Sequence, residues 1–306
     1  MTETLVAILA AAIAAGTPLV FAALGELVTE KSGVLNLGVE GMMLVGAVAG
    51  FAATAATGSP WLGIVAGVAA GAMMSLVFAV LTLQLMANQV ASGLALTLFG
   101  IGFSAFVGKP LESVSLGSQG VWAIPLLSEI PLVGPVLFRH HLLVYLSWAL
   151  FAGLSWFLYR SRAGLALRAV GESPESAHAI GYPVIAIRYL ATLFGGAMAG
   201  LGGAYLAEFY TPMWVEGMVA GRGWIALALV VFATWRPARV LLGAYLFGGV
   251  TIAQFFAQGA GWQVPSQFLS ALPYLATILV LVLISRNEST IRLNSPVSLG
   301  RSYRPD

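Results

Sequence analysis

The sequence predicts an all-α fold, a polytopic bundle of about nine membrane-spanning helices that forms a single domain over residues 1–306. Hydrophobic residues make up 59% of the chain and charged residues only 8%, against about 25% charged residues in an average globular domain. Two intervals, Gly41 to Gly108 and Val240 to Ser285, contain no charged residue. Such continuous apolar runs suit helices of about 20 residues that cross the hydrocarbon, whereas the strands of a membrane barrel would show alternation.

Nine apolar runs between charged or Pro- and Gly-rich breaks are the expected spans. They lie near residues 4–25, 34–56, 61–85, 90–108, 141–159, 188–208, 217–235, 240–257 and 266–285. The chain starts without a basic segment, so the first run is interpreted as a spanning helix and not as a cleaved signal.

The basic residues predict the orientation, because short cytoplasmic loops carry an excess of Lys and Arg. With the N-terminus outside, eleven of the 14 Lys and Arg residues fall on the cytoplasmic side. We therefore expect a multi-pass protein of the inner (plasma) membrane with a cytoplasmic tail, residues 286–306. Residues 109–140 become an extracytoplasmic loop, and their four prolines exclude one regular helix.

The second long connection, residues 160–187, is expected in the cytoplasm and contains a helix-start signal. Ser173 suits the N-cap and Pro174 the first helical position, with Glu175 near the positive end of the helix dipole. Gly181 and the following proline end this helix after about two turns. A short capped helix between two spans is available to contact a cytoplasmic partner.

Glycines set the expected packing and also interrupt two of the spans. Pairs spaced by four residues, such as Gly46 with Gly50 and Gly196 with Gly200, let helices approach closely in lipid. The runs 34–56 and 217–235 are both broken by glycines. Each is the second helix in a group of four, formed by the first to fourth and by the sixth to ninth expected helices. The two groups are expected to run in opposite directions through the membrane. This pattern is typical of inverted repeats whose broken helices meet near the midplane.

Four polar residues are candidates for a solute pathway. Asn36 and Glu40 lie one helical turn apart in a glycine-broken segment, and an ionisable group inside a membrane should face a partner or a wet cavity. Glu40 is either a structural carboxylate bonded to freed backbone amides or part of the pathway. Asn88 and Gln89 stand at a cytoplasmic helix end, where polar residues also occur without such a role.

Several classes of function are excluded. A net charge of +2 gives no reason to expect nucleic acid, and a chain without Cys, whose three His lack a second ligand at suitable spacing, predicts no metal site. No cofactor is expected. The chain also lacks a P-loop, a Gly-x-Ser-x-Gly elbow and a His-Glu-x-x-His pair, so we expect no enzyme and no ATP hydrolysis by this chain.

Four collinear blocks between about residues 25 and 250 resemble a known family. They are GELVTEKSGVLNLGVEGMMLVGA, NQVASGLALTLFGIGFSAFVG, RAVGESPESAHAIGYPVIAIRYLATLFGGAMAGLGGAYL and GRGWIALALVVFATWRPARVLLGAYLFGG. These blocks resemble the permease subunits of ABC importers of the branched-chain amino acid and simple-sugar superfamily. Within it they are most similar to the nucleoside branch, which basic-membrane-protein lipoproteins supply.

The resemblance implies a role for the short cytoplasmic helix as the coupling helix that docks on the ATP-binding subunit. The matching residues are Glu172, Glu175, Ser176, Ala177 and Gly181, of which Gly181 matches the glycine of the family motif. Where the family usually has an Ala-Ala pair, this chain has Ser176 and Ala177.

The resemblance also implies partners and a solute. The implied partners are an ATP-binding subunit, a second permease subunit, an extracytoplasmic substrate-binding lipoprotein and the membrane lipids. The second permease is expected to differ from this chain, so that the two form a heterodimer. The expected function is import of a small polar solute by alternating access, with a nucleoside as first choice and a simple sugar as the alternative. An ion-coupled secondary transporter, with Glu40 as the coupling acid, is the competing hypothesis from another class.

Overall fold

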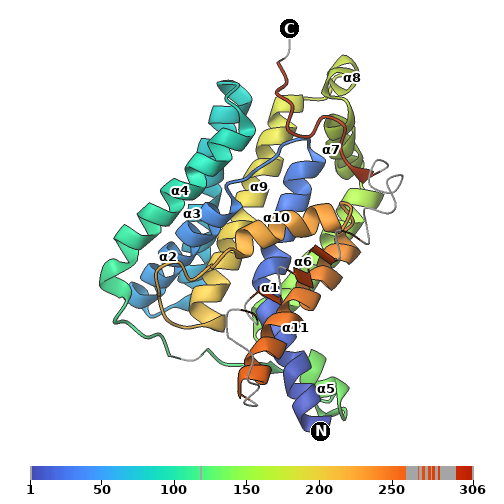
Figure 1. The fold of residues 1–306 in the computed structure, drawn as a ribbon. Helices are drawn as coiled ribbons and strands as arrows, with labels where there is room; N and C mark the ends of the chain where they lie inside the picture. The colour runs from blue at the N-terminus through green and yellow to red at the C-terminus, as the bar shows by residue number, and fades with distance from the viewer. Residues whose placement is uncertain are drawn as a thin grey trace.

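The computed structural model describes residues 2–117, 119–259 and 294–304, together with a few positions between 268 and 282. Helices dominate these residues, as expected for an all-α membrane bundle, and seven of the described helices are long and apolar enough to cross a membrane. Figure 1 shows them packed side by side, with the N-terminus at one end of the molecule and the C-terminus at the other.

The seven candidate spans agree with seven of the nine expected runs. They are α1 (Thr2–Lys31), α2 (Val39–Thr57), α3 (Pro60–Ala79) continued by the π-helix Val80–Gln84, α4 (Gln89–Gly108), α6 (Leu142–Arg160), α9 (Val184–Tyr205) continued by the π-helix Leu206–Tyr210, and α11 (Pro237–Gly259).

The prediction of a spanning helix at 217–235 is wrong, because the helix found there, α10 (Arg222–Phe232), has only 11 residues. At 1.5 Å per residue α10 is about 16 Å long, roughly half of the hydrocarbon thickness. Gly221 precedes it with a φ of +83°, and Thr234 and Trp235, with φ near +50°, end it. The remaining expected span, 266–285, lies for the most part outside the described residues.

Close helix packing confirms the expectation drawn from the glycines. The core forms where α9 packs against α1, α2 and α3, and α1 also packs against α11. A Cβ atom on Gly46 of α2 would overlap Gly200 of α9, and one on Gly71 of α3 would overlap the carbonyl of Gly196. These glycines let the backbones of α2, α3 and α9 approach closely, as lipid-embedded helices commonly do.

The described part of the connection between α4 and α6 contains only short elements. They are the 3₁₀ turns Lys109–Leu111 and Leu127–Glu129, the helix α5 (Val133–Leu137) and the antiparallel pair of β1 (Trp122–Ala123) with β2 (Arg139–His140). Burial lowers the pKa of His140, so its ring stays neutral, and its Nε2 lies 2.7 Å from the Val136 carbonyl oxygen.

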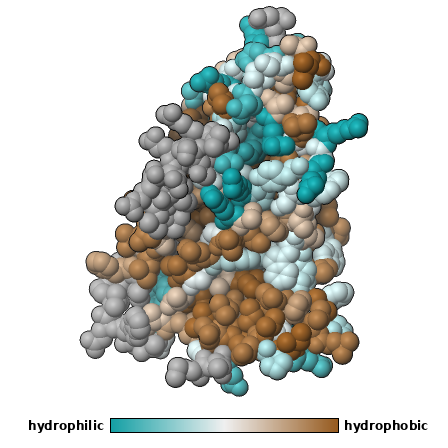
Figure 2. Space-filling model, turned by 90° about the vertical axis from the view of Figure 1, so that its right-hand side faces the viewer, coloured by the Kyte–Doolittle hydropathy of each residue, from teal (hydrophilic) through white to brown (hydrophobic). Residues whose placement is uncertain are grey.

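The opposite end of the molecule carries α7 (Arg162–Glu172), α8 (Pro174–Ala179) and residues 294–304, which we call the tail. Figure 2 shows one face of the molecule, on which hydrophilic side chains gather in the upper half, toward this end, and hydrophobic side chains fill most of the lower half. This distribution fits a bundle whose lower part lies in lipid and whose upper end meets water.

Candidate functional site

Glu40, in the first turn of α2, joins the starts of two interrupted helices. Its Oε1 accepts a hydrogen bond of 2.8 Å from the backbone N–H of Gly221, and its Oε2 accepts one of 2.6 Å from Gly223. These N–H groups lie at the N-terminus of α10, where a helix has unpaired donors and a positive dipole end. Figure 1 shows α10 crossing the middle of the molecule beside α2.

The contact between α2 and α10 leaves little room. A Cβ atom on Gly223 would lie 2.5 Å from both the Cα and the N of Glu40. The Glu40 side chain is only 5% exposed, and both of its oxygens accept hydrogen bonds. The carboxylate therefore fixes α10 against α2. This contact is of the kind expected if Glu40 is a structural carboxylate bonded to free backbone amides, but the amides belong to a segment far away in the chain.

Asn36 shapes the segment between α1 and α2. Its side chain is fully buried, its Oδ1 accepts the N–H of Gly38 at 2.9 Å, and its own backbone N–H donates to Glu26 at 3.2 Å. Asn36 thus closes an Asx turn, in which a side-chain oxygen accepts the backbone N–H two residues further along the chain. Its Nδ2 also donates to Met42 Sδ of α2 at 3.4 Å, so Asn36 joins the end of α1 to the start of α2.

Gln89 supports the same segment from α4, whereas Asn88 does not. Gln89 is 3% exposed and its Oε1 accepts the backbone N–H of Leu35 at 2.8 Å. Asn88 is exposed, and its side chain caps α4 by accepting the N–H of Ala91 at 3.0 Å. The structure therefore brings Asn36, Glu40 and Gln89 together around the α1–α2 break and leaves Asn88 as a helix cap.

Two buried carboxyl groups of α1 complete the polar surroundings of this break and were not among the predicted site residues. Glu26 and Glu30 are each 1% exposed and lie one turn apart. Glu26 accepts the N–H of Asn36, and Glu30 accepts the indole N–H of Trp235 at 2.5 Å. Their position near the end of a long apolar run was a signal that could have marked them.

At the other end of α2, Thr54 donates a hydrogen bond of 2.5 Å to Glu208 of the π-helical segment that continues α9. The Glu208 side chain is fully buried, and its second oxygen has no hydrogen-bond partner among the described residues. No group of three or more His, Cys, Asp or Glu side chains that could hold a metal occurs in the described part of the chain.

The α8 helix forms as the sequence predicts. Ser173 is its N-cap and accepts the N–H of Ser176 at 3.3 Å, Pro174 is the first residue, and the chain turns at Gly181 with a φ of +93°. Glu172, Glu175, Ser176 and Gly181 are exposed, whereas Ala177 is 2% exposed.

An apolar side chain is also exposed at this end of α8: Ile180, the residue that directly follows the helix, is 74% exposed. Ala177, in contrast, packs in a small cluster with Val170, Val184 and Tyr303 that attaches α8 to α7, α9 and the tail. The structure therefore presents four of the five predicted coupling residues at the surface and uses the fifth as an anchor.

Arg188 of α9 ties this end of the molecule together. Its side chain is 1% exposed, its Nε donates to the Ser32 carbonyl at 3.1 Å, and its Nη2 donates to Ser298 Oγ at 3.0 Å. Its Nη1 donates to the Arg301 carbonyl at 3.2 Å, and the guanidinium lies 5.9 Å from the centre of the Tyr303 ring. Sequence reasoning placed Arg188 only as one of the cytoplasmic charges, since its partners are distant in the chain.

The comparisons with known proteins point to one family. Residues 8–284 match the family model described as "Branched-chain amino acid transport system / permease component". No solved structure matches the chain significantly.

Three relatives match over nearly the whole chain. The "Putative glucose ABC transporter permease protein" of Haloferax volcanii is 44% identical and covers 97% of each chain. The nucleoside ABC transporter permease protein of Lactococcus lactis is 34% identical over 92% of this chain and 93% of its own. The guanosine ABC transporter permease protein of Bacillus subtilis is 31% identical over 92% of both chains.

Proposed function

The chain belongs to the family of branched-chain amino acid transport system permease components, and from this premise we propose that it forms the solute pathway of an ATP-driven importer. As an ABC transporter permease it is not itself an enzyme. ATP hydrolysis takes place on a separate ATP-binding subunit. The family match over residues 8–284 is the observation that carries this proposal, and it favours an ATP-driven importer over an ion-coupled carrier.

The pathway in this proposal runs along the contact of α2 with α10. Interrupted helices that meet inside a bundle are a common way to build a transport site. The Glu40 contact with the N-terminus of α10 supports this position, because it joins two such helices. Glu40 acts here by positioning α10, and Asn36 and Gln89 act by holding the break that precedes α2. Asn88 borders this region as a helix cap.

The order of the elements supports an inverted repeat, with α10 as a half-length member. In the first group α1 is followed by a break at 32–38 and then by α2. In the second, α9 is followed by a non-helical segment at 211–221 and then by α10. Alternating access would then come from rigid-body rocking of one group against the other.

The α8 helix is the proposed coupling element. Its exposed residues Glu175, Ser176 and Ile180 offer charged, polar and apolar contacts to an ATP-binding subunit. Ala177 and the tail hold α8 against α7 and α9, so that movement of α8 is transmitted to the spans. In this proposal α8 lies in the cytoplasm and the N-terminus of the chain lies outside.

The proposed assembly contains two further partners. A second permease, unlike this one, would complete the pathway, and an extracytoplasmic substrate-binding lipoprotein would deliver the solute to the connection between α4 and α6. Selection of the solute would then depend largely on the lipoprotein.

A nucleoside is the proposed solute, because a nucleoside permease and a guanosine permease each match 92% of this chain. A simple sugar is the second candidate, since the relative with the glucose description is 44% identical. Both solutes carry a hydroxylated sugar ring, which is the chemistry that they share.

Uptake in cells tests the proposal. Deletion of the gene should lower ATP-dependent uptake of a labelled nucleoside at least tenfold, and the wild-type gene should restore it. Loss of glucose uptake with normal nucleoside uptake would support the second candidate. Unchanged uptake of both solutes would reject both proposed substrates.

A further inference from the structure

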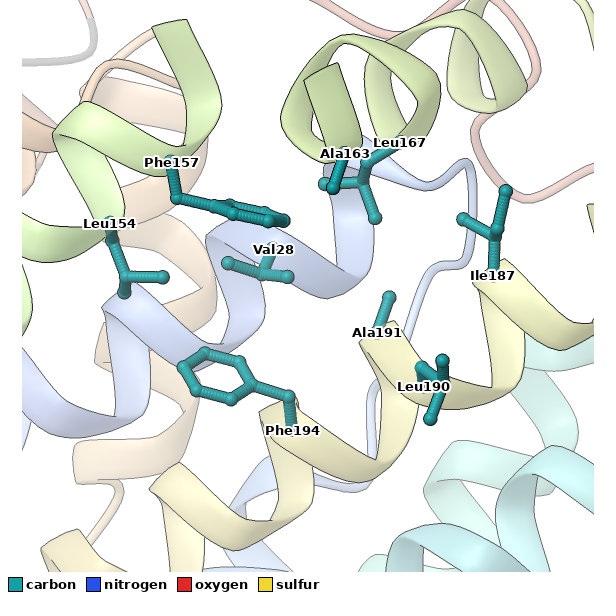
Figure 3. A pocket seen from close by; sticks show the side chains of 9 residues that line it. All are labelled: Val28, Leu154, Phe157, Ala163, Leu167, Ile187, Leu190, Ala191 and Phe194. Atoms are coloured by element: carbon teal, nitrogen blue, oxygen red, sulfur yellow. The ribbon is translucent and has the colours of Figure 1, made fainter. Parts of the chain in front are cut away.

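An apolar pocket of about 410 Å³ opens on the surface among α1, α6, α7 and α9. Figure 3 shows its side chains, with Phe157 and Phe194 on one side and Leu167 and Ile187 on the other. All nine residues that line it are apolar. The proposed transport function does not use this pocket.

The chemistry of the pocket does not suit the imported solute. Sites for small polar ligands combine an apolar lining with a few placed polar groups. This pocket offers no polar side chain, so a hydroxylated solute would lose its hydrogen bonds to water without replacement. A hydrocarbon chain is the ligand that such a lining accepts.

The pocket lies close to the ends of the spanning helices. Val28 is one turn from Lys31, the last residue of α1, and Phe157 is one turn from Arg160, the last residue of α6. One turn corresponds to about 5 Å along a helix. In a spanning helix, this distance from the polar end corresponds to the region where the acyl chains of one leaflet meet their headgroups.

Basic side chains stand next to this pocket. Arg160 and Arg162 are exposed and flank the turn between α6 and α7, two of the helices that line it. Arg168 stacks 5.6 Å over the Tyr159 ring, and its buried Nε has no hydrogen-bond partner among the described residues. None of the three forms an ion pair within the described residues, where the sole salt bridge lies just beyond α4.

From the apolar lining, the depth and these charges, we propose that the pocket binds one anionic phospholipid of the surrounding bilayer. An acyl chain enters between Phe157 and Leu167, and the phosphate lies against Arg160 and Arg162. Basic sites between spanning helices commonly hold anionic headgroups in this way. The lipid would attach α7, which leads directly into α8, to α6 and α9.

Native mass spectrometry of the delipidated, purified full-length chain tests this site without any transport measurement. The wild-type protein is titrated with phosphatidylglycerol, with phosphatidylcholine and with inorganic phosphate. One variant fills the pocket (Ala163→Trp), and a second removes the charges (Arg160→Gln with Arg162→Gln). The matched controls are Ala152→Trp on the exposed side of α6 and Arg139→Gln at the other end of the molecule.

We expect the wild-type protein to retain one phosphatidylglycerol with a roughly 10- to 30-fold preference over phosphatidylcholine. The double arginine variant should lose the preference, Ala163→Trp should lose the bound lipid, and both controls should behave as wild type. Unchanged lipid binding in both pocket variants would overturn the proposal. Displacement of the lipid by inorganic phosphate, or a change of oligomeric state in Ala163→Trp with unchanged lipid, would overturn it as well.

Discussion

At the scale of single residues, Glu40 shows how a bundle in lipid accommodates a carboxylate. A helix that starts inside a membrane exposes N–H groups that water cannot satisfy. The two Glu40 oxygens accept two of these groups at the start of α10, and the charge lies at the positive end of the helix dipole. One side chain thereby satisfies donors of α10 while it fixes the position of α2.

Glu40→Gln should weaken this contact, because a glutamine offers one acceptor oxygen where Glu40 offers two. Hydrogen bonds to charged groups contribute about 1.5–3 kcal/mol each, so we expect a loss of roughly 2 kcal/mol in stability and lower uptake, with assembly retained. Thermal unfolding of the purified protein and solute uptake measure the two effects.

Glu3→Gln, at an exposed position in the first turn of α1, is the matched control and should change neither quantity. Wild-type uptake together with wild-type coupling of ATP turnover in Glu40→Gln would reject a role for Glu40 in transport.

The sequence identifies Asn36 and Glu40, because their spacing of one helical turn involves only neighbouring residues of the chain. Asn36 and Glu40 are recognisable as polar groups in an apolar, glycine-rich segment. Their partners are not recognisable, since the Glu40 contact with Gly221 joins residues 181 positions apart. The same limit applies to Arg188, whose contacts with Ser32 and Ser298 form only after α1, α9 and the tail have packed together.

At the scale of elements, α8 depends on its two ends and on the tail. Ser173 starts it, Gly181 ends it, and Tyr303 packs beneath it beside Ala177. Six residues are too few for a stable isolated helix, so these contacts, and not helix propensity, hold α8 in place.

Gly181→Val should uncouple the permease from its ATP-binding subunit. The φ of +93° suits glycine, whereas a β-branched residue there is strained by about 1–2 kcal/mol. No heavy atom lies within 4 Å of an added Cβ, so the effect comes from the backbone and not from a clash. Co-purification of the ATP-binding subunit and solute uptake should both fall.

Gly181→Asn is the control for this change, because asparagine tolerates positive φ better than other residues and should retain more coupling. Normal co-purification and normal uptake in Gly181→Val would contradict the proposed role of this turn.

Arg188→Gln should release the tail. The variant loses donors to the Ser32 carbonyl, Ser298 Oγ and the Arg301 carbonyl, and we expect a stability loss of about 3 kcal/mol. Trypsin should then cleave after Arg301 faster than in the wild-type protein. Arg139→Gln, at an exposed position far from the tail, is the control, and equal cleavage rates in all three proteins would contradict this prediction.

At the scale of the whole molecule, hydropathy predicts most of the architecture, because each span must satisfy its own backbone in lipid. Seven expected runs coincide with long described helices. The prediction of a full span fails at 217–235. The glycines there indicate a break, but they do not reveal that the chain stays non-helical up to Gly221 and that the helix after it has only 11 residues. The short α10 can be recognised only from the turn before it and from its contact with Glu40.

The bundle and the surface-exposed α8 fit a transporter in which this chain forms the solute pathway and a partner subunit hydrolyses ATP. Family membership and the exposed α8 lead to the same expectation, namely that solute flux depends on nucleotide hydrolysis outside this chain.

Uptake into proteoliposomes measures this dependence most directly. The chain is reconstituted with its second permease, ATP-binding subunit and binding protein, and labelled nucleoside and glucose are supplied outside. We predict uptake with ATP, none with a non-hydrolysable analogue, and none by the permeases alone under a proton or sodium gradient. Gradient-driven uptake by this chain without the ATP-binding subunit would contradict the account.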